Sequence, residues 1–203
     1  MRRTRAFPIV VSGPSGAGKT TVVSEAISRG GLLRNSISVT TRLPRGDEVE
    51  GEAYYFVSEK EFEGLKRGKL IEWARVHDHF YGTPIDGVEE ALAQGHDVVL
   101  NIDVQGGKAV KKAFPEAVLI FILTPSREVL ESRIRKRATD VSGEIDKRLE
   151  NAWQEIRRAT GYDYIVENDQ LENTVDTVLA IIRAERHRRE RYSTDYIERF
   201  RGK

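Results

Sequence analysis

Cysteine is absent from the 203 residues of this sequence. Its absence excludes disulfide scaffolds, thiol nucleophiles, iron–sulfur clusters and zinc sites built on cysteine. Long apolar runs are missing as well, because the longest one, at 117–123, is far shorter than the roughly 20 residues that cross a bilayer. The basic start of the chain is followed by an apolar stretch too short for the core of a secretion signal. We therefore expect a soluble, cytoplasmic protein without membrane contact.

Neither sign of charge is in large excess. The 33 Lys and Arg residues against 32 Asp and Glu residues give a net charge of +1, so the whole molecule lacks the field typical of nucleic-acid-binding proteins. A composition with 39% hydrophobic and 32% charged residues excludes a disordered chain. The length suits one domain, or one core domain that carries a small inserted subdomain.

Short apolar runs alternate with helical patterns along most of the chain. The runs are rich in β-branched residues and continuous, which is typical of parallel strands covered on both faces. The predicted strands are 7–12, 98–102, 117–123 and 164–166. The predicted helices are 19–29, about 125–137, about 142–160, and an amphipathic helix with apolar residues at Leu171, Val175, Val178, Leu179 and Ile182. The pattern predicts an α/β protein with a parallel-sheet core flanked by helices.

Residues 35–83 break this alternation. Strand-like pieces at 37–41, 54–57 and 70–76 cluster there with few helix signals. Ser58 and Glu61 form a capping-box pattern that predicts one short helix to about residue 67. We expect a mostly antiparallel subdomain inserted in the α/β core.

The segment 13–20 has the pattern G-x-x-x-x-G-K-[ST] between a predicted strand and a predicted helix. Its glycines let backbone N–H groups turn toward phosphate oxygens, and the helix N-terminus adds partial positive charge. In such a loop Lys19 reaches the β- and γ-phosphates and the Thr20 hydroxyl takes one Mg²⁺ position. The strand–loop–helix context makes a chance match the weaker interpretation. The other expected nucleotide-binding residues are Gly13, Pro14, Ser15, Gly16, Ala17 and Gly18.

A second anion site is predicted in the inserted segment. Arg42 and Arg45 lie three residues apart with Pro44 between them, and two arginines so spaced can bind one phosphate. Tyr54 and Tyr81 can add phenolic donors. The alternative interpretation is a solvated loop with no ligand.

Glu72 lies inside an apolar strand pattern. A carboxylate there costs free energy unless it is paired, and a guanine base offers two adjacent donors, N1–H and the N2 amino group. Adenine presents an acceptor at N1, so a carboxylate disfavours it. The alternative is a surface position that faces water.

These motifs together resemble the guanylate kinase family, from about residue 8 to about residue 186. The phosphate-loop pattern alone is generic, whereas T-T-R-L-P-R-G-D at 40–47 followed by N-I-D-V-Q-G at 101–106 is specific. Further matches are G-E-A-Y-Y-F-V at 51–57, E-W-A at 72–74, Y-G-T at 81–83 and N-D at 168–169. The resemblance implies a P-loop NTPase core with a GMP-binding insert and a small helical lid.

The resemblance also implies a role for each matching position. The guanine base would be recognised by Ser38, Glu72, Thr83 and Asp103. The GMP phosphate would be bound by Arg42, Arg45, Tyr54 and Tyr81. Asn168 matches the position beside the adenine of ATP. The implied catalytic residues are Lys19, Arg42 and two lid arginines that would move over the transferred group, Arg137 and Arg148. The implied reaction is the reversible, Mg²⁺-dependent conversion of ATP and GMP to ADP and GDP. The sequence leaves open whether dGMP is also an acceptor.

On this basis we expect one guanylate kinase-like domain over 1–203. Its core would comprise 1–34, 84–125 and 160–190, its insert 35–83, its lid about 126–159 and its basic tail 187–203. Two positions depart from the family pattern. Asn101 stands where the family often has an acidic residue, so we assign it no metal role, and Ala138 stands where a glycine usually follows the lid arginine.

Other functions fit parts of the sequence. Guanylate kinase-like domains of scaffold proteins bind peptides, but the intact Lys19, Thr20 and lid arginines favour an enzyme. A kinase of sugar phosphates is disfavoured because a sugar offers no base to Ser38, Glu72 and Thr83. Histidines at 77 and 79 permit a metal site, although no third ligand is evident. The arginine-rich segment from 183 onward is expected to be a solvated helix face, with nucleic-acid contact as the weaker alternative.

Overall fold

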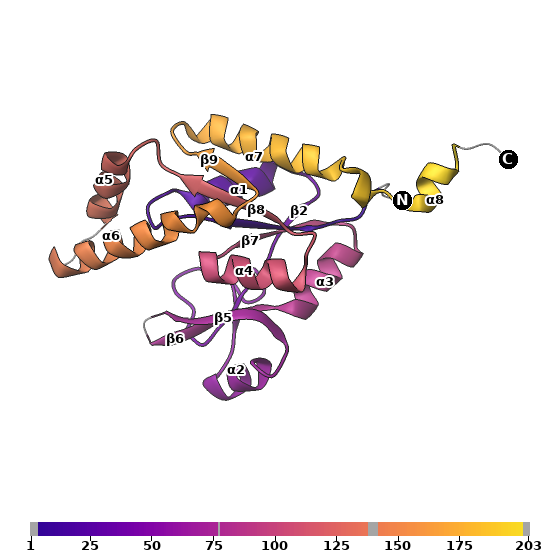
Figure 1. The fold of residues 1–203 in the computed structure, drawn as a ribbon. Coiled ribbons are helices and arrows are strands. Elements are labelled where there is room, and N and C mark those ends of the chain that lie inside the picture. The colour runs from indigo at the N-terminus through magenta and orange to yellow at the C-terminus, as the bar shows by residue number, and fades with distance from the viewer. Residues whose placement is uncertain (1–3, 77, 138–141, 201–203) are drawn as a thin grey trace.

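The computed structural model describes residues 4–76, 78–137 and 142–200, and within these the chain forms two sheets with helices around them (Figure 1). The larger sheet contains β1 (Pro8–Ser12), β2 (Leu33–Asn35), β7 (Asp97–Asn101), β8 (Val118–Leu123) and β9 (Tyr164–Glu167). Its strand order is β2-β7-β1-β8-β9, and every neighbouring pair is parallel. The predicted parallel core is confirmed.

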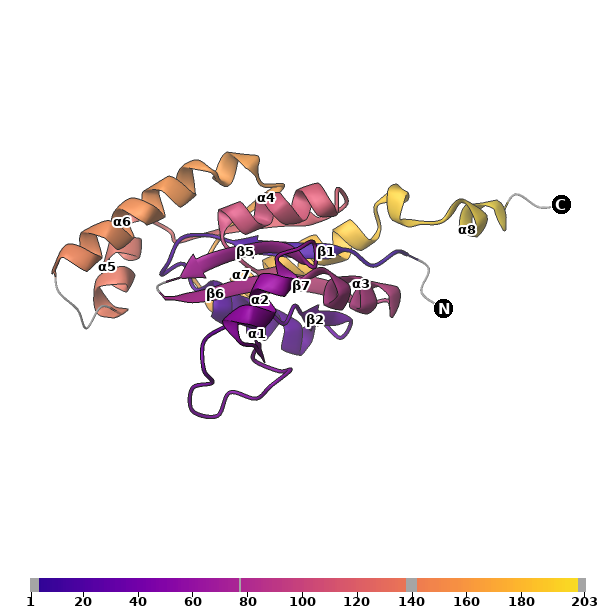
Figure 2. The ribbon, with the colours of Figure 1, turned by 90° about the horizontal axis from the view of Figure 1, so that it is seen from below.

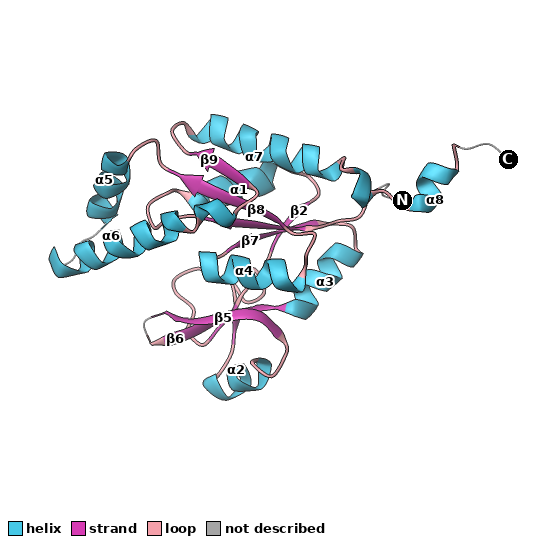
Figure 3. Ribbon diagram, viewed as in Figure 1, coloured by secondary structure: helices cyan, strands magenta, loops and turns pink. Residues whose placement is uncertain are grey.

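Helices cover both faces of this sheet (Figure 3). The helices α1 (Lys19–Arg29) and α7 (Leu171–Arg186) bury Val22, Ala26, Val175, Val178 and Ile182 against one face. On the other face lie α3 (Ile85–Ala93) and α4 (Val104–Ala113), which place Val88 and Val110 in a second cluster. Because both faces are covered, β1 is buried at all five positions, as its continuous apolar sequence predicts.

The inserted segment forms the second sheet, on the α3 and α4 side of the core (Figure 1). Its strands are β3 (Val39–Thr40), β4 (Tyr55–Phe56), β5 (Leu70–Val76) and β6 (His79–Pro84), in the order β4-β3-β6-β5. The β3–β4 pair is parallel and the other two pairs are antiparallel, so the expectation of a mostly antiparallel insert is confirmed.

One short helix, α2 (Glu59–Leu65), covers the second sheet. The predicted capping box is present: Ser58 Oγ accepts from the Glu61 N–H, and the Glu61 carboxylate accepts from the Ser58 N–H at 2.8 Å. The helix is held to the sheet by the stacking of Phe62 on Phe80, with ring centroids 5.3 Å apart.

The helices α5 (Arg127–Arg137) and α6 (Ser142–Arg157) form a hairpin that projects from the core (Figure 2). The hairpin has a small apolar cluster of its own, made of Leu130, Ile134, Leu149 and Ala152. The helix α6 ends at Arg157, a few residues before the predicted boundary, because a short 3₁₀ turn at Ala159–Gly161 leads into β9.

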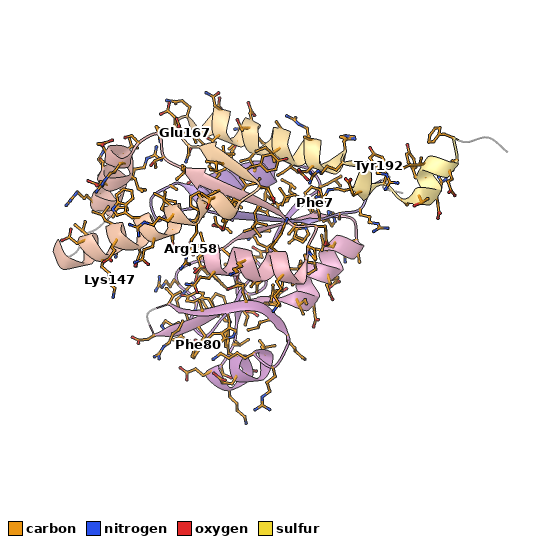
Figure 4. The ribbon with its side chains drawn as sticks, viewed as in Figure 1. Phe7, Phe80, Lys147, Arg158, Glu167 and Tyr192 are labelled. Atoms are coloured by element: carbon orange, nitrogen blue, oxygen red, sulfur yellow. The ribbon has the colours of Figure 1, made fainter. Side chains whose placement is uncertain are left out.

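The start of the C-terminal tail is fixed to the core. Arg191 is buried, its guanidinium lies 3.5 Å from the ring centroid of Phe7, and its Nε donates to the Glu185 carbonyl at 2.7 Å. Figure 4 labels Phe7 in the core and Tyr192 where the tail leaves it. Arg186 is paired with the fully buried Asp97 at 2.5 Å. The expectation of a wholly solvated arginine face is therefore wrong at these two positions.

Beyond Tyr192, a short helix α8 (Thr194–Glu198) buries no residue and extends away from the body (Figures 1 and 2). Among the described residues, no helix combines the length and the apolar character that crossing a membrane requires.

Candidate functional site

The phosphate loop joins β1 to α1 at the carboxyl edge of the core sheet, where ligands of parallel sheets commonly bind. Two of its glycines cannot be replaced without a clash. Gly13 has φ +149° and an added Cβ would lie 2.3 Å from the Ile122 carbonyl oxygen. Gly18 has φ +89° and its added Cβ would lie 2.3 Å from Nδ2 of Asn168. The neighbours of the loop, as well as its own conformation, require glycine there.

Lys19 and Thr20 begin α1 directly after the loop. The ammonium of Lys19 donates to the carbonyls of Gly13 and Pro14, at 2.5 and 3.1 Å, so the side chain curls back over the loop. The exposed Thr20 hydroxyl lies 3.3 Å from the amide nitrogen of Asn101, which donates to it. The two residues thus present a cation and a hydroxyl oxygen beside the loop.

The oxygen donors here fit a Mg²⁺ ion that arrives with a nucleotide. Within the described ranges, no group of three His, Cys, Asp or Glu side chains could hold a metal. Mg²⁺ keeps several waters and commonly takes one or two protein oxygens plus substrate phosphates, which matches a single Thr20 hydroxyl. The sequence also permitted a metal site at His77 and His79, but His77 lies outside the described residues. Between them, Oδ1 of Asp78 lies 3.7 Å from Nη2 of Arg75.

A cavity of about 390 Å³ connects the loop helix with the insert. The α1 side contributes Thr20, and Asn101 at the end of β7 lies next to it. The insert contributes three of the predicted GMP-binding residues, Ser38, Tyr54 and Thr83. One cavity is therefore lined both by Thr20, from the predicted ATP site, and by residues of the predicted GMP site, although these come from separate parts of the sequence.

Arg42 is surrounded by polar and aromatic groups in the insert. Its side chain is 7% exposed, and Nε donates to the Tyr81 hydroxyl at 3.2 Å. The Tyr54 ring centroid lies 5.3 Å from the guanidinium carbon. The carboxylate of Glu48 binds the guanidinium through both oxygens. These bonds raise the pKa of Arg42, chiefly through Glu48, and the same pair lowers the pKa of Glu48.

Arg45 lies near this cluster but exposes its side chain. Its backbone N–H donates to Glu48 Oε2 at 2.9 Å. The structure therefore places Arg42, Tyr54 and Tyr81 together, while the guanidinium of Arg45 extends into solvent from the same loop.

Glu72 is half-buried on β5, and the hydroxyl of Thr83 on β6 donates to its Oε1 at 2.5 Å. Burial raises the pKa of the Glu72 carboxyl, the Thr83 hydrogen bond opposes that shift, and the charge of Asp103 adds to it. Asp103 caps α4, with Oδ1 accepting from the N–H groups of Gln105 and Gly106 at 2.9 and 2.8 Å. A half-buried carboxylate with one hydroxyl partner has acceptor capacity for a donor-bearing ligand.

Asn168 lies on the other side of the phosphate loop, beside a cavity of about 340 Å³. Gly16, Gly18, Thr21 and Arg133 also line this cavity. Asn168 is buried, and its amide donates to the Ala17 carbonyl at 2.7 Å. The Asn168 amide therefore supports the loop, a contact that the sequence does not reveal.

The lid arginines are placed only in part. Arg148 is half-buried on α6, while the side chain of Arg137 and residue Ala138 lie outside the described part of the structure. Sequence reasoning also missed Arg133, whose Nη2 donates to the Asn168 carbonyl at 3.3 Å, and Glu48. Nothing in a one-dimensional pattern distinguishes these two from the other charged residues of the chain.

Comparisons with known proteins agree with this geometry. The family model for guanylate kinase matches residues 5–185. A guanylate kinase of Bacillus cereus is 48% identical over the whole of both chains, and one of Caldanaerobacter subterraneus is 47% identical over 94% of this chain and 93% of the relative. The crystal structure of guanylate kinase from Anaplasma phagocytophilum superposes with a TM-score of 0.75 at 34% identity, covering 94% of this chain and 92% of that one. With its phosphate loop facing an insert that carries Arg42 and Glu72, the chain belongs to the guanylate kinase family.

Proposed function

We propose that this chain carries out the reaction of its family, the ATP-dependent phosphorylation of GMP to GDP, and that its parts divide the work. The core, 1–34, 84–125 and 160–190, holds ATP. The insert, 35–83, holds GMP, and the hairpin at about 126–159 acts as the lid. We place the reaction in the cytoplasm, with ATP and GMP as its partners.

The observation that carries this assignment is the cavity shared by Thr20, Ser38, Tyr54 and Thr83. Phosphoryl transfer requires donor and acceptor phosphates in line and in contact, and catalysis is mainly positioning and charge neutralisation. A cavity lined by the phosphate-loop helix on one side and the insert on the other supports that arrangement.

The positively charged side chains of the protein would offset the electrostatic repulsion between ATP and GMP. We assign the β- and γ-phosphates of ATP to the loop at 13–20 and the Lys19 ammonium, and the GMP phosphate to Arg42, Arg45, Tyr54 and Tyr81. Because the attacking oxygen of GMP is already anionic, no strong general base is needed. Arg137 and Arg148 are assigned to the transferred group from the lid, where closure would also exclude water.

The Thr20 hydroxyl would hold a Mg²⁺ ion that arrives with ATP, and the ion would supply neutralisation of phosphate charge. The Thr20 hydroxyl, oriented by the Asn101 amide, is the protein oxygen available to it. Asn168 is assigned to the adenine side of the site, where it lines the second cavity.

Guanine recognition rests on Glu72. The half-buried carboxylate, already bonded to Thr83, would accept from N1–H and the N2 amino group of guanine. Ser38 and Asp103 complete the proposed base site. Adenine would place an acceptor against the same carboxylate, and an unpaired buried charge is costly, so the site discriminates against AMP.

The assignment is tested by ADP formation from Mg·ATP with a panel of acceptors: GMP, AMP, CMP, UMP and ribose phosphates. Turnover that depends on GMP at about ten per second supports it. Turnover with a sugar phosphate, or binding of ATP without any turnover, contradicts it, and the latter result would favour a scaffold-like peptide-binding role.

A further inference from the structure

Glu48 and Arg42 form a bidentate ion pair inside the insert. The Nη1–Oε2 and Nη2–Oε1 distances are 2.8 and 2.9 Å. The Arg42 side chain is 7% exposed and that of Glu48 is 27% exposed, so this pair is far less solvated than an ordinary surface pair. Fork-to-fork geometry of this kind fixes the plane of a guanidinium as well as its position.

The donors of Arg42 are almost fully used by the protein. Nε donates to Tyr81, Nη1 donates to the Leu43 carbonyl at 2.7 Å and to Glu48, and Nη2 donates to Glu48. One of the five guanidinium N–H groups is left for a ligand among the described contacts. Since Tyr81 accepts from Arg42, its own hydroxyl proton is available to a phosphate as well.

The same carboxylate also holds the following turn. Glu48 Oε2 accepts from the Arg45 N–H at 2.9 Å, and the Glu48 N–H donates to the Arg45 carbonyl at 3.1 Å. The residues between Arg42 and Glu48, 43–47, are all exposed, with Leu43 at 81%. Glu48 therefore ties the side chain of the first arginine to the backbone of the second.

We infer that Glu48 is a positioning residue for the acceptor phosphate: through its ion pair it holds the Arg42 guanidinium in the arrangement that receives the phosphate of GMP. The inference rests on the proposed role of Arg42. A long, flexible arginine loses side-chain entropy when it binds a ligand, and a guanidinium ordered beforehand avoids that loss. Glu48 does not need to touch GMP for this effect.

A purely structural ion pair makes a different prediction. If Glu48 only stabilised the insert, its loss would weaken the binding of every ligand of the insert alike, with or without a phosphate. If Glu48 acts through Arg42, its loss must affect phosphate-bearing ligands alone, and must have no effect once Arg42 is gone. These two expectations can be separated with GMP and guanosine as probes.

The experiment measures GMP and guanosine affinity by calorimetry for the wild type, Glu48→Gln, Arg42→Ala and the double variant. Glutamine keeps the size of the side chain but removes the charge and one acceptor. We expect Glu48→Gln to lower the affinity for GMP about tenfold and to change the affinity for guanosine less than twofold. In the Arg42→Ala background it should change GMP affinity less than twofold. Steady-state kinetics should show a higher KM for GMP and an unchanged KM for ATP.

Glu50→Gln is the matched control. Glu50 lies in the same loop and accepts from the Phe56 N–H at 2.9 Å, without touching either arginine. It should leave GMP affinity unchanged. If Glu48→Gln lowers the thermal stability, Glu48→Asp serves as a second variant, because it keeps the charge on a shorter side chain. Glu48→Asp should recover part of the GMP affinity.

An equal loss of GMP and guanosine affinity in Glu48→Gln would overturn the inference, and so would a loss that persists without Arg42. If Arg42→Ala itself binds GMP normally, the proposed role of Arg42 fails first. If Arg42→Ala weakens GMP while Glu48→Gln does not, only the inference fails.

Discussion

The side-chain amide of Asn168 is bonded to the Ala17 carbonyl of the phosphate loop at 2.7 Å, across 151 positions of sequence. Its Oδ1 accepts from the Thr174 hydroxyl at 3.1 Å, so the amide connects the loop to α7. Ala17, Asn168 and Thr174 are all buried. Gly18 has no room for a side chain, because an added Cβ would lie 2.3 Å from Nδ2 of Asn168. The shape of the phosphate loop therefore depends on a residue after the last strand of the sheet.

Asn168→Ala should loosen the phosphate loop. The change leaves the Ala17 carbonyl without its donor, and an unsatisfied buried group costs about 1–3 kcal/mol of unfolding free energy. We also expect a higher KM for ATP with little change for GMP. Chemical denaturation and steady-state kinetics check both effects, and Asn173→Ala on the exposed face of α7 is the control. An unchanged free energy of unfolding would show that the hydrogen bond from Asn168 to the Ala17 carbonyl is not needed for stability.

Lys19→Ala should abolish turnover while leaving the fold intact. Lys19 is half-buried, and its ammonium is held over the loop by the Gly13 and Pro14 carbonyls, beside the proposed phosphate site. A cation that acts on the transferring group commonly contributes a factor of about a thousand or more. ADP formation at saturating substrates is the measurement, with Lys60→Ala on α2 as the control. A kcat near that of the wild type would remove Lys19 from the catalytic residues.

Glu72→Gln should make the ligand-free protein more stable at neutral pH. Burial raises the pKa of this carboxyl in the folded protein, so the ionised form costs stability above that pKa. The cost disappears as the pH falls through the folded pKa toward the unfolded one, because both states are then protonated. We expect the variant to gain stability at pH 7.5 and to show no gain at pH 4, where the carboxyl is protonated in both states. Denaturation at the two pH values is the measurement, and a gain that persists in acid would contradict burial of the ionised carboxylate as its cause.

The same substitution should impair base recognition. Glutamine keeps an acceptor for Thr83 but offers a donor where guanine also has donors. We expect the GMP to AMP ratio of kcat/KM to fall about tenfold to a hundredfold, the range for a lost charged hydrogen bond. Parallel assays with both acceptors measure the ratio. An unchanged ratio would remove Glu72 from base recognition, even if the stability gain is observed.

Much of this architecture can be predicted from local patterns. The helix at 19–29, the strand at 70–76 and the capping box at Ser58 are each predicted at or near their observed bounds. In these segments a continuous apolar run, an alternation or a cap agrees with the tertiary structure. The sequence also predicts that Glu72 needs a partner, because an unpaired carboxylate in an apolar strand is costly. It does not identify the Thr83 hydroxyl as that partner.

The elements that escape prediction have physical reasons for doing so. The helix α4 carries Gly106 and Gly107, which argue against a helix locally. They are there because an added Cβ on Gly107 would lie 2.8 Å from the Tyr162 hydroxyl, and one on Gly106 would lie 3.1 Å from Ile102. The strand β6 contains Gly82 and Pro84, and it is stabilised by pairing on both sides. Such tertiary contacts leave no periodic signal in the sequence.

The C-terminal tail should contribute to stability through Arg191 and hardly at all through residues 194–203. Deleting residues 194–203 should leave kcat and the unfolding free energy nearly unchanged, because α8 buries no residue. Arg191→Ala should cost about 3 kcal/mol, since it removes the stack on Phe7 and one cationic partner of the buried Glu185 carboxylate. Denaturation of both variants measures the difference. A deletion as costly as Arg191→Ala would show that the fixed part of the tail extends past Tyr192.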